Sequence, residues 1–223
     1  MDEMISFQDV TKDYDTQTAL RNITFSVDKG EMAFITGPSG SGKTTLLKLI
    51  YCAEKPDKGT ISVAGFETAA IKESTVPALR RHIGIVFQDF RLLENKNVFE
   101  NVAIALRIRG VSEREMKTRV YDSLKTVTLR HKSDAYPKSL SGGEQQRVVI
   151  ARAIVAEPTV LLADEPTGNL DPDTAAGVMR TFKDVNAKGT TILIATHNRD
   201  LFRHTGRKVI KLDSGNLVGE ELG

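Results

Sequence analysis

Gly37-Pro38-Ser39-Gly40-Ser41-Gly42-Lys43-Thr44 matches the pattern G-x-x-x-x-G-K-[ST] at every defined position. The glycines allow successive backbone N–H groups to turn inward around a phosphate chain, and the following helix directs its positive end at the same charge. Lys43 can reach the β- and γ-phosphates, and the Thr44 hydroxyl suits a Mg²⁺ ligand. Residues 31–36 are typical of a buried strand and residues 45–50 of a helix. We therefore predict a phosphate-binding loop between a strand and a helix of an α/β fold.

The composition favours an intracellular protein whose net charge is close to zero. The 223 residues are enough for one large domain. Lys and Arg number 31 and Asp and Glu 29, and the net charge of +2 argues against nucleic acid or anionic lipid as a partner. Cys52 is the only cysteine, which excludes an intrachain disulfide, and we expect it to fill the core within the helix after the loop. The N-terminus has no signal-peptide pattern, and no apolar run approaches the ~20 residues of a membrane helix, so we expect any membrane role to require a partner.

Four short apolar runs are each followed at once by polar residues. They cover residues 34–36, 83–87, 160–163 and 191–195, and their continuous apolar character is typical of strands buried on both faces of a parallel sheet. Ligands of open α/β sheets bind beyond the carboxyl ends of the strands. We therefore expect the residues after these runs to converge, namely the phosphate-binding loop, Gln88, Asp164 with Glu165, and His197.

The remaining segments predict two additions to this sheet. Between Gln88 and Pro158 the pattern is helical, with helices expected at 98–109, after a capping box at 112–115, and at 142–156. Residues 5–7, 23–27 and 60–63 alternate and predict antiparallel strands. We predict one α/β domain over residues 1–223, with a mainly parallel core sheet, an N-terminal antiparallel β subdomain, and a helical subdomain inserted at about 89–157.

Two adjacent carboxylates follow the third apolar run. Consecutive side chains at a strand end point to opposite sides, so Asp164 could hold Mg²⁺ while Glu165 acts as general base toward an attacking water. An acidic helix cap is the alternative interpretation. His197 is placed to hydrogen-bond a γ-phosphate, and Gln88 to contact Mg²⁺ or water, although either residue alone would be an unremarkable polar group.

Leu140-Ser141-Gly142-Gly143-Glu144 is a second glycine turn that opens a helix. A chain with two different anion-binding helix starts either holds two ligands or builds one site from two copies of itself.

The whole set of motifs, in this order and over almost the whole chain, resembles the ATPase domain of ABC transporters. The resemblance implies that residues 37–44 form the Walker A motif, Asp164 the Walker B aspartate, Glu165 the catalytic base and Gln88 the Q-loop. It also implies that Ser141, Gly142 and Gly143 form the signature motif, Asp171 the D-loop and His197 the H-loop switch. Thr45 and Glu144 are included among the nucleotide-binding residues on the same grounds.

The same resemblance implies the ligands and the assembly. ATP and Mg²⁺ are the expected cofactors, with Thr44, Gln88 and Asp164 as metal ligands, and an ATP-dependent homodimer encloses each ATP between the Walker A loop of one subunit and the signature of the other. Tyr14 stands where the family places an aromatic residue stacked on adenine; a core tyrosine is the alternative.

Residues 76–81, 87–93, 100–103 and 162–171 resemble the cell-division branch of this family, although lipoprotein-release and macrolide-efflux ATPases share much of these segments. Asn198 departs from the aspartate that is common there. The resemblance implies an integral membrane partner resembling FtsX, cytoplasmic division-ring proteins as further partners, a location at the cytoplasmic face of the inner membrane, and control of cell-wall hydrolysis at the septum. The alternatives are the ATPase subunit of a lipoprotein-release or macrolide-efflux transporter and a soluble ABC ATPase.

An apolar cluster follows Gln88. It comprises Phe90, Leu92, Leu93, Val98 and Phe99. The cluster either belongs to the core or, as the resemblance implies, forms the surface that docks a cytoplasmic element of the membrane partner.

Overall fold

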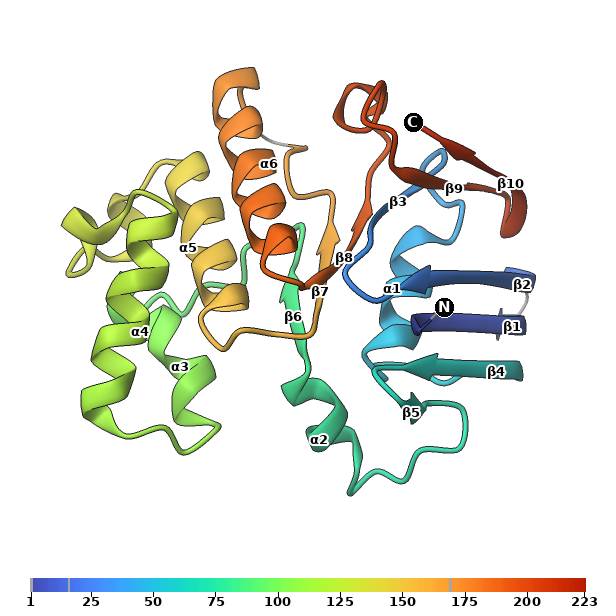
Figure 1. Cartoon of the computed structure of the whole chain (residues 1–223), viewed down its shortest axis with the longest axis horizontal. Helices are drawn as coiled ribbons and strands as arrows, with labels where there is room; N and C mark the ends of the chain where they lie inside the picture. Colours follow the sequence, from blue (N-terminus) through green and yellow to red (C-terminus); the bar gives the residue numbers. More distant parts are fainter. Residues whose placement is uncertain (1, 16, 169) are drawn as a thin grey trace.

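A six-stranded sheet forms the centre of the molecule in the computed structural model, which describes residues 2–15, 17–168 and 170–223 (Figure 1). Its strand order is β10-β9-β3-β8-β7-β6. The strands are β3 (Met32–Thr36), β6 (Ile83–Val86), β7 (Val160–Asp164), β8 (Thr191–Ala195), β9 (Lys208–Asp213) and β10 (Asn216–Leu222). All the pairings are parallel except that of β10 with β9. The mainly parallel core sheet is therefore confirmed, and β9 and β10 are additions that the sequence analysis did not predict.

Side-chain alternation along these strands divides the interior into two cores. Phe34, Leu161 and Ile194 face one core, whereas Ile35 and Leu162 face the other. Both faces are covered, which explains why the strands are apolar at nearly every position.

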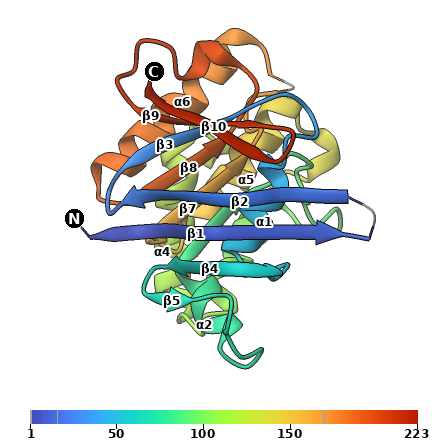
Figure 2. The same ribbon diagram turned by 90° about the vertical axis from the view of Figure 1, so that its right-hand side faces the viewer.

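One core lies between the central sheet and an antiparallel N-terminal sheet of order β2-β1-β4-β5. Its strands are β1 (Glu3–Tyr14), β2 (Gln17–Asp28), β4 (Lys58–Val63) and β5 (Phe66–Glu67). Helix α1 (Lys43–Ile50) lies behind this sheet in Figure 2 and contributes four buried apolar side chains to the core: Leu46, Leu47, Leu49 and Ile50.

The other core is covered by helices. Helices α3 (Val98–Arg107), α4 (Glu113–Thr126) and α5 (Gly142–Ile154) gather beyond β6, and α6 (Pro172–Ala187) packs beside them (Figure 1). Helix α2 (Val76–Arg81) and the short 3₁₀ segments η1 (Arg130–Lys132), η2 (Pro137–Ser139) and η3 (Arg199–Leu201) complete the chain. Helix α6 was not predicted. Among the described residues, no helix has both the length and the apolar character needed to cross a membrane.

Two local predictions are wrong. Ser112 caps α4 by accepting a bond from the Glu115 amide, but the Glu115 carboxylate pairs with Arg119 at 2.8 Å instead of returning to the cap, so the capping box is only half formed. Cys52 lies beyond the end of α1 with φ 54, rather than within the helix. It is half-buried against the core, and burial raises the pKa of its thiol.

Candidate active site

An open hollow of about 630 Å³ brings together most of the predicted nucleotide-binding residues. Its lining includes Tyr14, Pro38, Ser39, Gly40, Gly42, Lys43, Thr44, Thr45, Gln88, Asp164, Glu165 and His197. These residues come from the end of β1, the loop between β3 and α1, the first turn of α1, and the carboxyl ends of β6, β7 and β8. Gln17 and Ala19 of β2 also line the hollow and were not predicted.

The loop between β3 and α1 uses its glycines in different ways. At Gly42 (φ 102) an added Cβ would lie 2.7 Å from the Ala19 carbonyl oxygen, and at Gly37 (φ 154) only 2.1 Å from the Leu212 carbonyl oxygen. Gly40 (φ 78) has open space around it, so its requirement is the left-handed backbone alone. The loop therefore stays open where a phosphate chain would lie and is tightly packed on its protein side.

The Lys43 side chain is buried and turned back over the loop. Its Nζ donates to the carbonyl oxygens of Gly37, at 2.8 Å, and Pro38, at 2.9 Å. A positive charge is thus held at the mouth of a loop that already favours anions.

Thr44 and Asp164 meet across the hollow. The Thr44 hydroxyl donates to Asp164 Oδ2 at 2.8 Å. Burial raises the pKa of Asp164 and the neighbouring Glu165 charge adds to this rise, although the Thr44 hydrogen bond opposes it. A hydroxyl and a carboxylate at this distance fit Mg²⁺, which proteins usually hold through one or two oxygen ligands together with substrate phosphates.

The register of two parallel strands places Glu165 beside His197. Asp164 pairs with Ala195, and the Glu165 amide donates to the Ala195 carbonyl at 2.9 Å. Glu165 itself has φ 45, which turns its side chain away from that of Asp164 and toward the residues after β8. The next α-helix, α6, begins at Pro172 with Asp171 as its cap, so the interpretation of Asp164 and Glu165 as a helix cap is wrong.

The Glu165 carboxylate is held by three hydrogen bonds. Its Oε1 accepts from the His197 amide at 3.0 Å and from His197 Nδ1 at 2.8 Å, and its Oε2 accepts from the Thr196 hydroxyl at 3.2 Å. The Glu165 side chain is 11 % exposed and that of His197 67 %. Because Nδ1 of His197 is hydrogen-bonded to the Glu165 carboxylate, Nε2 is the ring nitrogen that can contact a ligand. Thr196 was not predicted, although its position directly before His197 is a signal that could have found it.

Tyr14 lies at the end of β1 and is 39 % exposed, so the core alternative is wrong. Its hydroxyl donates to the Glu54 carboxylate, and the Lys12 ammonium lies 5.5 Å from the ring centroid. Partial burial and the Glu54 bond raise the pKa of Tyr14. The result is an aromatic ring held in place where it lines the hollow.

The predicted signature residues lie elsewhere, at the start of α5. Ser141 and Glu144 form a complete capping box: the Ser141 hydroxyl accepts from the Glu144 amide at 3.3 Å, and the Glu144 carboxylate accepts from the Ser141 amide at 2.9 Å. Lys132 also donates to this carboxylate and lowers the pKa of Glu144. Glu144 is therefore directed back into its own chain, which does not favour the prediction that it contacts nucleotide.

The two glycines of this turn differ. An added Cβ at Gly143 would lie 2.9 Å from Thr174 Cγ2, whereas at Gly142 it would meet nothing within 4 Å. Asp171 caps α6 through the Thr174 amide at 2.9 Å, so the starts of α5 and α6 touch. Asn169, part of the predicted D-loop, lies outside the described residues.

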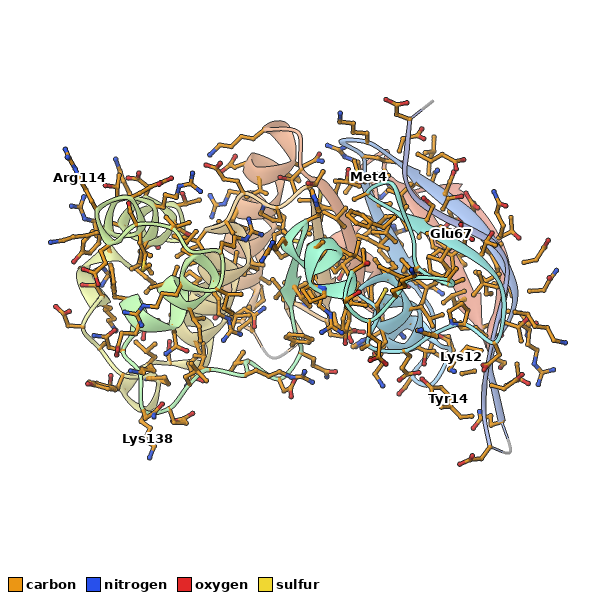
Figure 3. The ribbon with its side chains drawn as sticks, turned by 90° about the horizontal axis from the view of Figure 1, so that it is seen from below. Met4, Lys12, Tyr14, Glu67, Arg114 and Lys138 are labelled. Atoms are coloured by element: carbon orange, nitrogen blue, oxygen red, sulfur yellow. The ribbon has the colours of Figure 1, made fainter. Side chains whose placement is uncertain are left out.

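The signature and the phosphate-binding loop are separated in the chain. Lys138, just before the signature, and Tyr14, at the rim of the hollow, lie toward opposite ends of the same edge of the molecule in Figure 3. Neither Ser141, Gly142, Gly143, Glu144 nor Asp171 lines the hollow.

Some side chains of the segment after Gln88 pack in the core, and others lie on the surface. Phe90, Leu92 and Phe99 pack against the helical core and Val98 is fully buried, whereas Leu93 is 38 % exposed. Only Leu93 of the predicted docking cluster is a large exposed apolar side chain.

Comparison with known protein families gives a match of residues 20–168 to the ABC transporter family. This match agrees with the phosphate-binding loop, the carboxylates at the strand end and the distant glycine turn. The chain belongs to this family. It is 49 % identical to the cell division ATP-binding protein FtsE of Streptococcus pneumoniae, over 98 % of the chain and 95 % of that protein. Identity to FtsE of Escherichia coli is 48 %, over 97 % of the chain and 98 % of that protein.

Solved ABC cassettes share the fold. The dimeric cassette MJ0796 in a post-hydrolysis state, bound to ADP and phosphate, superposes with a TM-score of 0.91 at 35 % identity, covering 98 % of both chains. A second dimeric structure of MJ0796 gives a TM-score of 0.92 at 36 % identity, again over 98 % of both chains. The predicted P-loop fold of ABC type is confirmed. The chain is an ATP-hydrolysing ABC ATPase of the cell-division ATP-binding type.

Proposed function

We propose that the chain works as an ATP-dependent homodimer in which the Walker A loop of one subunit and the signature turn of the other enclose each ATP. The observation that carries this proposal is that the signature residues at the start of α5 do not line the hollow around the start of α1. Gly142 adds support. An added Cβ at Gly142 would meet nothing in its own chain, so the close approach of a ligand bound to a second subunit would explain why a glycine stands there.

Each residue of the hollow then has a role that its position supports. Lys43 and the loop amides bind the β- and γ-phosphates, and Tyr14 stacks on adenine. Thr44 and Asp164 hold Mg²⁺, with Gln88 as the exposed third oxygen ligand. Bound there, Mg²⁺ would neutralise charge on the phosphate oxygens.

Glu165 acts as the general base toward the attacking water. Its carboxylate is largely desolvated but not paired with a cation such as Lys or Arg, which suits proton abstraction. His197 orients the carboxylate through Nδ1 and keeps Nε2 to contact the γ-phosphate, so it links the base to the presence of the phosphate that is cleaved.

We further propose an integral membrane partner of the FtsX type, and through it a place at the cytoplasmic face of the inner membrane. ATP hydrolysis would then control cell-wall hydrolysis at the septum, with division-ring proteins as further partners. The cell-division names of the relatives support this assignment over lipoprotein release or macrolide efflux. Leu93 is the anchor that the exposed part of the Q-loop segment offers to the partner.

A pair of variants tests the chemistry. Glu165→Gln keeps the size of the side chain and one acceptor but removes the base, so hydrolysis should fall by about 10²–10⁴-fold while ATP-induced dimers accumulate. Lys43→Ala should lose ATP binding itself. Near-normal turnover of Glu165→Gln would refute the assignment of the base.

A mixture of two inactive chains tests the shared site. A Lys43→Ala chain retains its signature, and a Gly142→Asp chain retains its Walker A loop, so only their heterodimer contains one complete site. ATP hydrolysis by the mixture, absent from either chain alone, is the expected result. Absence of both hydrolysis and dimer formation would refute the two-subunit site. Gly142 is preferred to Gly143 because a side chain at Gly143 would also meet Thr174.

Co-purification tests the partner. Leu93→Ala should weaken retention of the membrane partner and leave the melting temperature within a few degrees of the unmodified chain. Phe90→Ala is the matched core variant, and it should lower the melting temperature because Phe90 packs against the helical core. Undiminished recovery of the partner with Leu93→Ala would contradict the docking role.

A further inference from the structure

Arg152 connects the last third of α5 to the segment that follows Gln88. Its guanidinium donates from Nη1 to the Arg91 carbonyl at 2.7 Å and from Nη2 to the Phe90 carbonyl at 2.9 Å. The backbone two and three residues beyond Gln88 is therefore bound directly to α5. At 1.5 Å per residue, Arg152 stands about 15 Å along the helix axis from Gly142 at the signature end.

The bound segment has a fixed shape. Arg91 has φ 49, in the left-handed region. Its guanidinium lies 4.0 Å from the Phe87 ring centroid and pairs with Asp89 at 3.0 Å. A rotation of the Gln88 end would thus move the carbonyl groups that Arg152 holds, rather than being absorbed in a loose loop.

The hydrogen-bond partners of Arg152 are backbone carbonyl groups rather than carboxylates. Its observed hydrogen bonds are to neutral carbonyl oxygens, and burial, reinforced by the neighbouring Arg91 charge, lowers its pKa. A half-buried guanidinium without an anionic partner carries a desolvation cost. Two donors in a fixed fork, however, hold two consecutive carbonyl groups in one orientation, which a lysine or an apolar side chain does not do.

Helix α5 is a rigid connection between these two ends. Its 13 residues run from Gly142 to Ile154, the capping box fixes its start, and Val148, Val149 and Ile150 are fully or almost fully buried. A displacement at Arg152 is therefore passed to the signature end with little bending.

We propose that Arg152 is a positioning residue that ties the segment after Gln88 to the signature end of α5, so that the nucleotide in one composite site sets the position of the signature turn that completes the other. This inference rests on the proposed two-subunit site. It predicts that the two sites of the dimer communicate, and that the communication depends on Arg152 although Arg152 does not line the hollow.

Arg109 provides a matched control. Its guanidinium also bridges two backbone carbonyl groups, those of Ala156 and Arg81, and burial also lowers its pKa. It does not bond to the segment after Gln88. Arg152→Met and Arg109→Met therefore remove the same kind of interaction, and only the first should affect communication between the sites.

The decisive experiment places Arg152→Met on one chain at a time in a mixture of Glu165→Gln and Gly142→Asp chains, each inactive alone. The single hydrolysing site uses Gln88 of the Gly142→Asp chain and the signature of the Glu165→Gln chain, and the Glu165→Gln chain still binds ATP beside its own Gln88. If Arg152 acts through α5, hydrolysis falls when Arg152→Met is on the Glu165→Gln chain, which lends only its signature to that site, as well as when it is on the other. A loss confined to the Gly142→Asp chain would show that Arg152 only shapes its own Q-loop and would overturn the inference.

Cooperativity of the unmixed protein is the second readout. The dependence of hydrolysis on ATP should be sigmoidal in the parent chain and should become hyperbolic in both Arg152→Met and Arg152→Lys, whereas Arg109→Met should stay sigmoidal. Binding of a fluorescent ATP analogue to dilute monomer should be unchanged in all of them, and melting temperatures identify a variant that merely fails to fold. A hyperbolic parent, or equal loss in Arg109→Met at equal stability, would overturn the inference. If Glu165→Gln forms no ATP-induced dimer, it is the two-subunit site that fails.

Discussion

Replacement of Asn101 by Ala should remove the polar contacts that hold the loop between Gln88 and α3. The Asn101 side chain is fully buried. Its Oδ1 accepts from the Leu93 amide at 2.8 Å, and its Nδ2 donates to the carbonyls of Leu93, Lys96 and Asn97 at 3.1, 2.9 and 3.0 Å. The Asn97 carbonyl also accepts from the Asn101 amide, and the Leu93 carbonyl also accepts from the Lys96 amide. Alanine therefore leaves two backbone groups without their partner, the Leu93 amide and the Lys96 carbonyl.

The size of the effect follows from those two groups. A buried polar group without its partner costs about 1–3 kcal/mol, and the low end applies because water reaches a loop that carries the exposed Leu93, which gives about 2 kcal/mol in total. At about 2–4 °C per kcal/mol for a chain of this size, the melting temperature should fall by about 4–8 °C. Recovery of the membrane partner should fall with it, because the same bonds position Leu93.

Circular dichroism melts of the nucleotide-free protein measure this fall, with ATPase activity at 25 °C as the companion assay. Asn101→Asp is the matched variant: it keeps the acceptor for the Leu93 amide but turns a carboxylate oxygen toward three carbonyl groups, so it should be at least as destabilised at pH 7. A fall below about 2 °C for Asn101→Ala, or a normal melting temperature for Asn101→Asp, would refute the hydrogen-bond argument.

Three further predictions concern the site itself. Asp164→Asn should raise the melting temperature of the nucleotide-free protein, because burial raises the pKa of Asp164 and so disfavours its charged form, while Mg²⁺-dependent hydrolysis is lost; an unchanged or lower melting temperature would contradict this. The bond to Lys132 lowers the pKa of Glu144 in the folded chain, so this bond stabilises the fold at pH values above the ordinary carboxyl pKa of 4.5. The stabilisation is lost as the pH falls through the lowered pKa of the folded state. Melting temperatures of Glu144→Gln measured across this pH range should lack that part of the acid dependence. Gly143→Ala should reduce hydrolysis and stability through its contact with Thr174, and Thr174→Ser, which removes the nearest methyl group, should restore both; failure of the second change to help would show that the clash is not the cause.

The main sheet could be predicted because its strands are apolar on both faces. The runs at Phe34, Ile85 and Leu162 carry that signal in a few residues, and each is followed by the polar group that forms the hollow. The strand β9 escaped prediction because Lys208 and Lys211 interrupt its apolar run, yet its Val209 and Ile210 are fully buried. The charged residues are tolerated because Lys208 pairs with Glu31 and Lys211 with Glu221.

The sequence alone could not distinguish the roles of individual residues within a motif. Gly142 and Gly143 look equivalent there, but only Gly143 has a neighbour in its own chain, at Thr174. Phe90 and Leu93 belong to one apolar cluster, yet they lie on opposite sides of the boundary between core and surface. These differences depend on contacts between segments far apart in the sequence, and no local pattern records such contacts.

The site holds each of its reactive groups with a protein partner of complementary chemistry. The Lys43 ammonium donates to two carbonyl oxygens, and the Thr44 hydroxyl donates to the Asp164 carboxylate. His197 Nδ1 is hydrogen-bonded to the Glu165 carboxylate. Phosphate, Mg²⁺ and water offer the same kinds of partner, so nucleotide binding exchanges one set of bonds for another instead of creating new ones. In the proposed dimer, the contacts that a second subunit adds at Ser141 and Gly142 would therefore decide whether ATP stays bound. The connection through Arg152 would then matter for hydrolysis, because the helix that Arg152 holds would carry the half-site that each subunit gives to the other.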